Sequence, residues 1–171
     1  MRTHKAQALT PDFTVSFVIF LMVVALSINL WNVANDKEMW IRDIEDMHKK
    51  SRTITDILIT NTGSPVEWDN ETVVFLGFAE EDHVLNKTKL LSFKNIEYAR
   101  AKSLMSLGAN DFNLTMYYKN GTIIVLDSKN ISYGTDYSEG DYIIHSERIA
   151  LINNSGNLIS TKINLVLWRK L

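Results

Sequence analysis

The side chains able to do chemistry in this 171-residue chain form no catalytic pattern. The 4 histidines share no metal-ligand spacing, and the sequence contains no serine nucleophile elbow, no P-loop and no dinucleotide-binding glycine motif. Cysteine is absent, which excludes thiolate nucleophiles, disulfide bonds and cysteine-bound metals. We therefore expect that the protein is not an enzyme and that it binds no cofactor.

Two short acidic segments are the remaining candidates for cation binding. The run Glu80–His83 is contiguous, and a contiguous run of charges is typical of a solvated loop. Asp136, Glu139 and Asp141 surround Gly140, and loop carboxylates of this kind could converge on Ca²⁺. An ordinary polar turn explains the same residues, so we expect no metal site.

The composition indicates one domain of ordinary size with an appendage. Apolar residues make up 46% of the chain, which is enough for a hydrophobic core. The formal net charge is −2, and residues of both signs are interspersed without a basic stripe. We therefore expect no nucleic-acid partner.

An apolar segment near the N-terminus determines the topology. From Phe13 to Asn35 the chain carries no charged residue, and about 20 apolar residues are enough to cross a bilayer as a helix. Arg2, His4 and Lys5 precede the segment and the bulk of the chain follows it. The positive-inside rule therefore predicts a cytoplasmic N-terminus and an external C-terminal domain.

Three interpretations of this segment remain: a helix that is retained after a short leader is cut off, a permanent single-pass anchor, and a secretory signal. Ala25 and Ser27 have the spacing of a signal-peptidase site, and cleavage there would release a soluble, secreted protein. However, apolar residues continue through Leu30, and Asp12 directly precedes the run, where a signal peptide is normally basic or neutral. We therefore favour a segment that is retained.

The basic leader MRTHKAQ, followed by ALTPDF and the apolar run, resembles the class III signal peptide of archaeal type IV pilin-like proteins. The resemblance implies a prepilin peptidase that cuts on the cytoplasmic side, near Lys5. Counted from Gln7, Asp12 is the sixth residue, whereas the acid in this family is usually the fifth. Cleavage after Gln7 restores the usual spacing, so the scissile bond is either Ala6–Gln7 or Gln7–Ala8.

Asp12 and Phe13 are the residues that this resemblance assigns to filament register. A carboxylate at the edge of an apolar helix core is costly unless it is paired, and the new α-amino group of a neighbouring subunit is one partner. The alternative is an acid at a helix N-terminus that faces lipid headgroups and is stabilised by the helix dipole.

We expect the helix to continue beyond the apolar run, from about Pro11 to about Thr60. Spacings of four and three residues predict a stripe that packs on the downstream domain. Asn61–Pro65 contains the glycine and proline that end helices. The predicted segments are 1–7 (leader), 8–34 (membrane-spanning helix), 35–60 (amphipathic continuation) and 61–171 (head domain). The stripe consists of Val33, Trp40, Ile44, Met47, Ser51, Ile54 and Leu58.

The head domain is predicted to have an α+β fold, with the long helix packed on an antiparallel sheet. Asn120 and Gly121 indicate one tight hairpin, and Asn153–Gly156 indicates a second. A helix is expected over Ile96–Leu107, capped by Asn95, and a turn or short helix over 86–94. The predicted strands, rich in β-branched and aromatic residues, are Thr72–Phe78, Phe112–Tyr118, Thr122–Asp127, Tyr142–Ile152 and Leu158–Trp168.

A second resemblance lies in the head domain. The segments Gly63–Trp68, Leu76–Ala79, Val84–Asn86 and LLSFKNIEYARAKSLMSLG are similar to the ectodomains of archaeal class III signal-peptide proteins. Glycosylation is expected on the outside, best at Asn120 and Asn153 because hairpin turns are accessible. The candidate acceptors are Asn70, Asn86, Asn113, Asn120, Asn130 and Asn153.

Together these features predict a major or minor subunit of a cell-surface filament of the type IV pilus kind. The resemblance implies that its partners are a prepilin peptidase, the cytoplasmic membrane and identical or related pilin subunits. The alternative is a membrane-anchored external protein that binds a ligand or acts as an accessory subunit.

Overall fold

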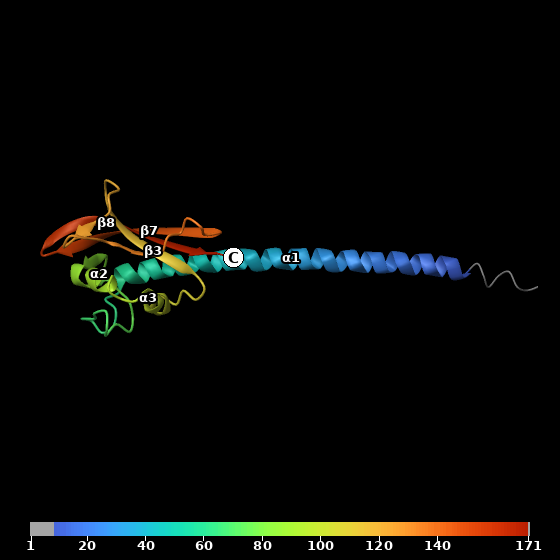
Figure 1. Cartoon of the computed structure of the whole chain (residues 1–171), viewed down its shortest axis with the longest axis horizontal. Helices are drawn as coiled ribbons and strands as arrows, with labels where there is room; N and C mark the ends of the chain where they lie inside the picture. Colours follow the sequence, from blue (N-terminus) through green and yellow to red (C-terminus); the bar gives the residue numbers. More distant parts are fainter. Residues whose placement is uncertain (1–8, 171) are drawn as a thin grey trace, which may run out of the picture. The chain divides into compact units, whose positions relative to one another are not determined.

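The computed structural model describes the backbone of residues 9–170 and the side chains from residue 12 onward. Two compact units make up the chain, Met1–Asp43 and Ile44–Leu171. Among the described residues the first unit is helical throughout, and the second contains all of the strands (Figure 1). The fold is therefore of the α+β class, as predicted.

Helix α1 (Leu9–Thr60) is 52 residues long. Its one proline, Pro11, lies in the first turn, where a backbone N–H has no intrahelical acceptor to lose. After the helix, the backbone N–H of Gly63 donates to Asn61 Oδ1 at 2.9 Å, and Gly63 adopts a φ of 79°. A long helix ending near Thr60 is therefore confirmed.

The C-terminal part of α1 buries one face in the second unit. The buried or half-buried members of the predicted stripe are Ile44, Met47, Ser51, Ile54 and Leu58. Val33 and Trp40, upstream members of the predicted stripe, are 55% and 48% exposed. The predicted spacing is therefore confirmed from Ile44 onward.

The second unit contains a six-stranded sheet in the order β1-β2-β7-β8-β3-β6. A two-stranded ribbon is formed by β4 (Val125–Leu126) and β5 (Lys129–Asn130). The strands of the main sheet are β1 (Ala79–Glu81), β2 (Val84–Asn86), β3 (Asp111–Tyr118), β6 (Ser132–Gly134), β7 (Tyr142–Asn154) and β8 (Asn157–Arg169).

One strand pair departs from the predicted antiparallel sheet. Strand β2 runs parallel to β7, with Val84 opposite Leu151, whereas the other pairs are antiparallel. This three-residue strand lies between β1, with which it pairs antiparallel, and β7, and it leads directly into α2 (Lys87–Phe93). The prediction of a purely antiparallel sheet is therefore wrong at β2.

The C-terminal hairpin is the longest pairing in the sheet. Strands β7 and β8 have 13 residues each and pair from Tyr142–Arg169 to Asn154–Asn157. Ser155 and Gly156 adopt φ angles of 54° and 88°, as a two-residue turn with matching twist requires. The predicted hairpin is therefore confirmed, with both strands longer than expected.

The segment Thr72–Phe78 forms a loop, so the prediction of a strand there is wrong. Leu76, Gly77 and Phe78 are buried in succession, which is incompatible with the alternation of a strand that has one wet face. The guanidinium of Arg100 donates to loop carbonyls, at 2.8 Å to Glu71 O and 3.1 Å to Val73 O. Because a side chain satisfies these carbonyls, the loop needs no neighbouring strand.

The predicted strand Thr122–Asp127 is present only in part, as β4. The backbone N–H of Ile124 donates to Met116 O at 2.9 Å, but the chain reverses at Asp127 and Ser128, whose φ angles are 46° and 62°. The tight turn before it is confirmed, because Tyr118 N–H donates to Thr122 O at 2.8 Å.

The two short helices begin differently. Asn86 caps α2, and its Oδ1 accepts from the N–H groups of Thr88 and Lys89 at 2.8 and 3.2 Å. Helix α3 (Tyr98–Leu104) comes directly after Glu97, whose side chain makes no cap hydrogen bond. The predicted Asn95 cap is wrong.

The reason lies in the turn at the end of α2. The N–H groups of Asn95 and Ile96 still donate to Ser92 O and Phe93 O, at 3.0 and 3.1 Å. Ile96 itself is 3% exposed, as part of the core. The second helix therefore starts later than its sequence pattern indicates.

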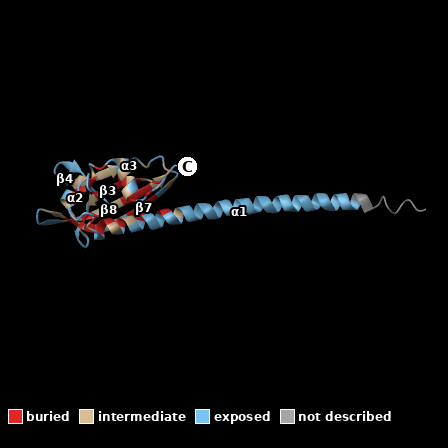
Figure 2. Cartoon of the chain, turned by 90° about the horizontal axis from the view of Figure 1, so that it is seen from below, coloured by how far each residue is buried: buried red, intermediate tan, exposed pale blue. Residues whose placement is uncertain are grey.

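Aromatic side chains from separate elements meet in the core. The ring of Phe93 lies edge-on to Phe78 and to Tyr133, with centroids 5.1 and 5.0 Å apart. Tyr98 stacks on Phe112 with centroids 5.1 Å apart. Figure 2 shows the buried residues gathered between the sheet and the helices. This cluster joins α2, α3 and the sheet into one core.

A buried lysine holds the loop after α1. Lys89 is 4% exposed, and its Nζ donates to Thr62 O at 2.7 Å and to Ala79 O at 3.2 Å. Burial lowers the pKa of its ammonium group. Trp68 Nε1 also donates to Thr62 O, at 3.2 Å, and to Gly77 O, at 3.0 Å. The two donors together satisfy carbonyls of Thr62 and Gly77 in the loop and of Ala79 at the start of β1.

We predict that Lys89→Met lowers the free energy of unfolding by about 1–3 kcal/mol, because Ala79 O loses its donor. The measurement is chemical denaturation of the full chain in detergent. Lys119→Met, on an exposed turn, is the matched control and changes the same quantity by less than about 0.5 kcal/mol. Equal losses in the two variants would contradict a structural role for Lys89.

Candidate functional site

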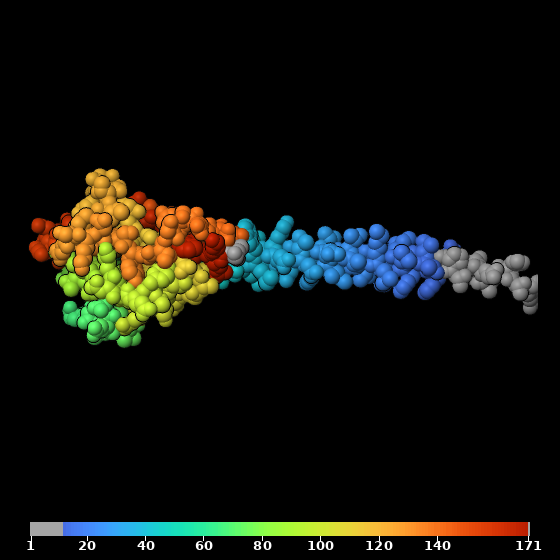
Figure 3. Space-filling model, in the orientation of Figure 1, coloured from blue at the N-terminus to red at the C-terminus, as the bar shows by residue number. Residues whose placement is uncertain are grey.

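The apolar half of α1 is the main candidate for a functional surface. It is long and apolar enough to cross a membrane, and no described residue of the chain buries its apolar stretch. Phe20, Leu30 and Trp31 are 61%, 71% and 74% exposed. Figure 3 shows the segment as an uninterrupted blue surface. A surface of this size requires a lipid or protein cover.

Polar side chains inside the apolar segment bond to the helix itself. Ser27 Oγ donates to Val23 O at 2.8 Å, and Asn29 Nδ2 donates to Ala25 O at 2.9 Å. Donors satisfied in this way can enter a bilayer or a helix bundle at little cost. The segment is therefore compatible with both environments.

Asp12 and Phe13 lie at the N-terminal end of this surface. Asp12 is in the first turn of α1 and is exposed, and no hydrogen bond or ion pair within the described part of the chain involves its carboxylate. Phe13 is 70% exposed, and its ring is parallel to that of Phe17 within 10°, with centroids 6.2 Å apart. Both predicted roles of Asp12, as partner of an amino group and as headgroup contact, are compatible with this position. The predicted leader residues Lys5, Ala6, Gln7 and Ala8 lie outside the described residues.

The six candidate glycosylation sites differ in accessibility. Asn120 and Asn130 are exposed, on the turn after β3 and at the end of β5. Asn120 Oδ1 accepts from the backbone N–H and the hydroxyl of Thr122, at 3.0 and 2.7 Å. The amide nitrogen of Asn120 points away from these bonds and is open to modification.

The remaining sites are half-buried, and two have their amide nitrogen occupied. Asn113 Nδ2 donates to Thr135 O at 3.1 Å, and Asn153 Nδ2 donates to Glu80 Oε2 at 3.1 Å. The expectation that Asn153 is among the most accessible sites is therefore wrong, because β1 lies close enough to bind its side chain. Asn70 and Asn86 are also half-buried.

The acidic segments do not converge on a cation. The carboxylate of Asp136 accepts from Ser138 Oγ and N–H, at 2.8 and 3.1 Å, and these bonds lower its pKa. Glu139 pairs with Lys170 at 2.8 Å, and Asp82 with His83 at 2.9 Å. Across residues 9–170 no three histidine, aspartate or glutamate side chains are placed to hold a metal.

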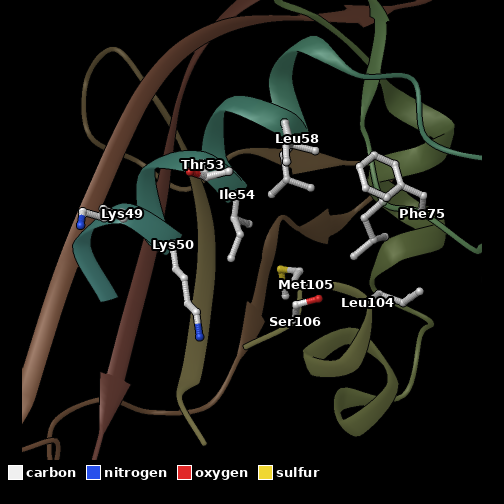
Figure 4. A pocket seen from close by; sticks show the side chains of 11 residues that line it. Lys49, Lys50, Thr53, Ile54, Leu58, Phe75, Leu104, Met105 and Ser106 are labelled. Atoms are coloured by element: carbon white, nitrogen blue, oxygen red, sulfur yellow. The ribbon is translucent and has the colours of Figure 1, made fainter. Parts of the chain in front are cut away.

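The structure contains a groove in the second unit that sequence reasoning missed. Its volume is about 320 Å³, and α1, the loop after it and the end of α3 line it (Figure 4). Phe75 is 40% exposed in its wall. Residues so distant in sequence give no local pattern. The apolar lining residues are Ile54, Ile57, Leu58, Phe75, Leu76, Leu104 and Met105.

No family model matches this chain, and comparisons with curated proteins and with solved structures also find no match. Its function is therefore inferred from the apolar half of α1 and from the head domain.

We predict that Phe20→Arg combined with Val24→Arg releases the chain from membranes, because two arginines at the centre of the span cost about 5–7 kcal/mol of insertion free energy. The measurement is the fraction of full-length chain that resists alkaline carbonate extraction. Phe20→Leu combined with Val24→Ile is the control and stays in the membrane. Equal resistance of the two variants would rule out a lipid-spanning segment.

We also predict that Asn120→Gln removes a glycan from the protein expressed in a host with N-glycosylation, whereas Asn113→Gln leaves the glycan mass unchanged. The difference arises from the free amide nitrogen of Asn120 and the bonded one of Asn113. Intact-mass spectrometry measures both variants. A glycan found on Asn113 and not on Asn120 would contradict the structural ranking.

Proposed function

We propose that this protein is a structural subunit, a major or minor pilin, of an extracellular filament of the archaeal type IV pilus kind. The observation that supports the proposal is a membrane-length apolar segment with uncovered side chains, in a helix whose later part is built into a folded domain. A lone helix of this kind is stable in a bilayer or among copies of itself, and a filament subunit uses both environments in turn.

The proposed pathway begins in the cytoplasmic membrane. The N-terminus is inside and the α+β domain is outside, as the basic residues before the segment favour. A prepilin peptidase removes the leader at Ala6–Gln7 or Gln7–Ala8. The apolar helices then leave the lipid and pack against identical or related subunits, while the head domains face the solvent.

Asp12 sets the register in this proposal. Its carboxylate is exposed beside Phe13 in the first turn of α1, at the border of the apolar surface. When helices pack, the carboxylate is transferred into apolar surroundings, where an unpaired charge is strongly unfavourable. The α-amino group created by leader removal on a neighbouring subunit supplies the opposite charge.

A second candidate function is a single-pass anchored protein that binds an external ligand or acts as an accessory subunit. The groove lined by Ile57, Phe75 and Leu104 favours it, because apolar grooves of this size hold ligands or peptide side chains. The two candidates differ in processing, since an anchored receptor keeps its leader and remains a monomer in detergent.

The intact mass of the protein extracted from cells tests the proposal. We predict that the mature chain begins at Gln7 or Ala8 and is recovered in sheared filaments. A chain that still begins at Met1 and is monomeric supports the anchored receptor instead. A soluble chain that begins near Ile28 would show that the segment is a secretory signal.

We further predict that Asp12→Asn reduces the filament fraction by about tenfold or more, because the partner amino group is left without a counter-charge. Leader removal is expected to continue in this variant, as read by mass. Asp12→Glu keeps the charge and is the matched control. If the Asp12→Asn variant forms normal filaments, the proposed pair with an α-amino group is excluded. Contact with lipid headgroups is then the remaining role of Asp12.

A further inference from the structure

A second stripe on α1 faces a different direction from the buried one. Its members are spaced at steps of three and four residues, which places them on one side of the helix. The upstream members are acidic around Met39, which is 55% exposed. The downstream members are Lys50, which is positively charged, and the uncharged residues Thr53 and Ile57. The stripe consists of Asp36, Met39, Asp43, Asp46, Lys50, Thr53 and Ile57.

The downstream half of this stripe forms one wall of the groove. Lys50, Thr53 and Ile57 all line it. In Figure 4 the side chains of Lys50 and Ile54 extend from α1 to the same side. Lys50 is exposed, so its ammonium group stands in solvent at the mouth of an apolar groove. An occupant therefore needs an apolar side chain beside a carboxylate.

The upstream half of the same stripe has this chemistry. Asp36 and Met39 are three residues apart, are both exposed, and lie on one face of the helix. In a parallel copy shifted by two heptads, about 21 Å along the axis, Asp36 lies opposite Lys50 and Met39 opposite Thr53. The charges are complementary in this register, and the thioether enters the apolar groove.

We infer that the groove is a docking site for a second copy of this chain, which inserts Met39 between α1 and the end of α3 while its Asp36 pairs with Lys50. This inference rests on the proposed filament, because parallel helices with an axial shift are what a filament provides. It adds a contact outside the apolar segment, and the contact selects one axial register among those that apolar packing allows.

Cross-linking tests the contact directly, since the chain has no cysteine of its own. Two full-length chains with different tags are co-expressed, one carrying Met39→Cys and the other Thr53→Cys, and filaments are treated with a mild oxidant. We expect disulfide-linked heterodimers between the two tags. The control partner is Asn157→Cys, on the exposed β7–β8 hairpin, which is expected to give at least about fivefold less cross-linked product. Equal yields from both partners would overturn the inference.

A charge exchange tests the ion pair. Asp36→Lys and Lys50→Asp each place like charges together, and each is expected to lower the ratio of sheared filament to membrane-retained subunit by about two- to fivefold. The double variant restores opposite charges and is expected to recover most of the wild-type ratio. A double variant as poor as the two single variants combined would exclude the pair.

The outcomes distinguish this inference from the proposed function. If wild-type filaments form but neither the cross-link nor the charge rescue is observed, the groove has another occupant and the filament proposal stands. If the wild-type chain forms no filament and stays monomeric with its leader attached, the filament proposal fails first. If the cross-link forms in filaments and the rescue succeeds, both are supported.

Discussion

The apolar side chains between Asp12 and Ala34 must be removed from water, and the rest of the molecule is organised around that requirement. The segment forms a helix whose backbone groups are paired internally apart from the first turn, and the side chains of Ser27 and Asn29 bond to helix carbonyls. Nothing in the described part of the chain covers it. A lipid or protein cover is therefore required, and a bilayer and a bundle of helices would both supply one.

The head domain depends on the same helix in a different way. From Ile44 onward α1 presents an apolar face to the second unit, and Met47, Leu58 and Ile59 are almost fully buried there. The long β7–β8 hairpin provides the centre of the sheet, and the aromatic cluster around Phe93 belongs to the same core as these residues of α1. One helix thus contributes both an uncovered apolar surface and part of a packed core.

The candidate functional features outside the apolar segment come from tertiary contacts. The groove is assembled from α1, the loop around Phe75 and the end of α3, and Lys50 marks its mouth. The same packing separates the glycosylation candidates, because the amide nitrogens of Asn113 and Asn153 donate to Thr135 and Glu80. Neither property can be read from the glycosylation motif or from the helix pattern alone. Each depends on which side chains lie nearby in space.

The sequence alone determined the features that are local in origin. The length of the apolar run predicted the uncovered helix, and apolar residues spaced three and four apart predicted the buried face of α1 from Ile44 onward. Turn residues predicted the β7–β8 hairpin. Each of these signals lies within one contiguous segment of the sequence. Only the tertiary structure decided the parallel direction of β2, the loop at Thr72–Phe78 and the delayed start of α3. These depend on contacts far along the chain: β2 pairs with β7, Arg100 donates to carbonyls of the loop, and the hydroxyl of Tyr133 donates to Ile96 O. A long-range contact leaves no periodic trace in the residues that make it.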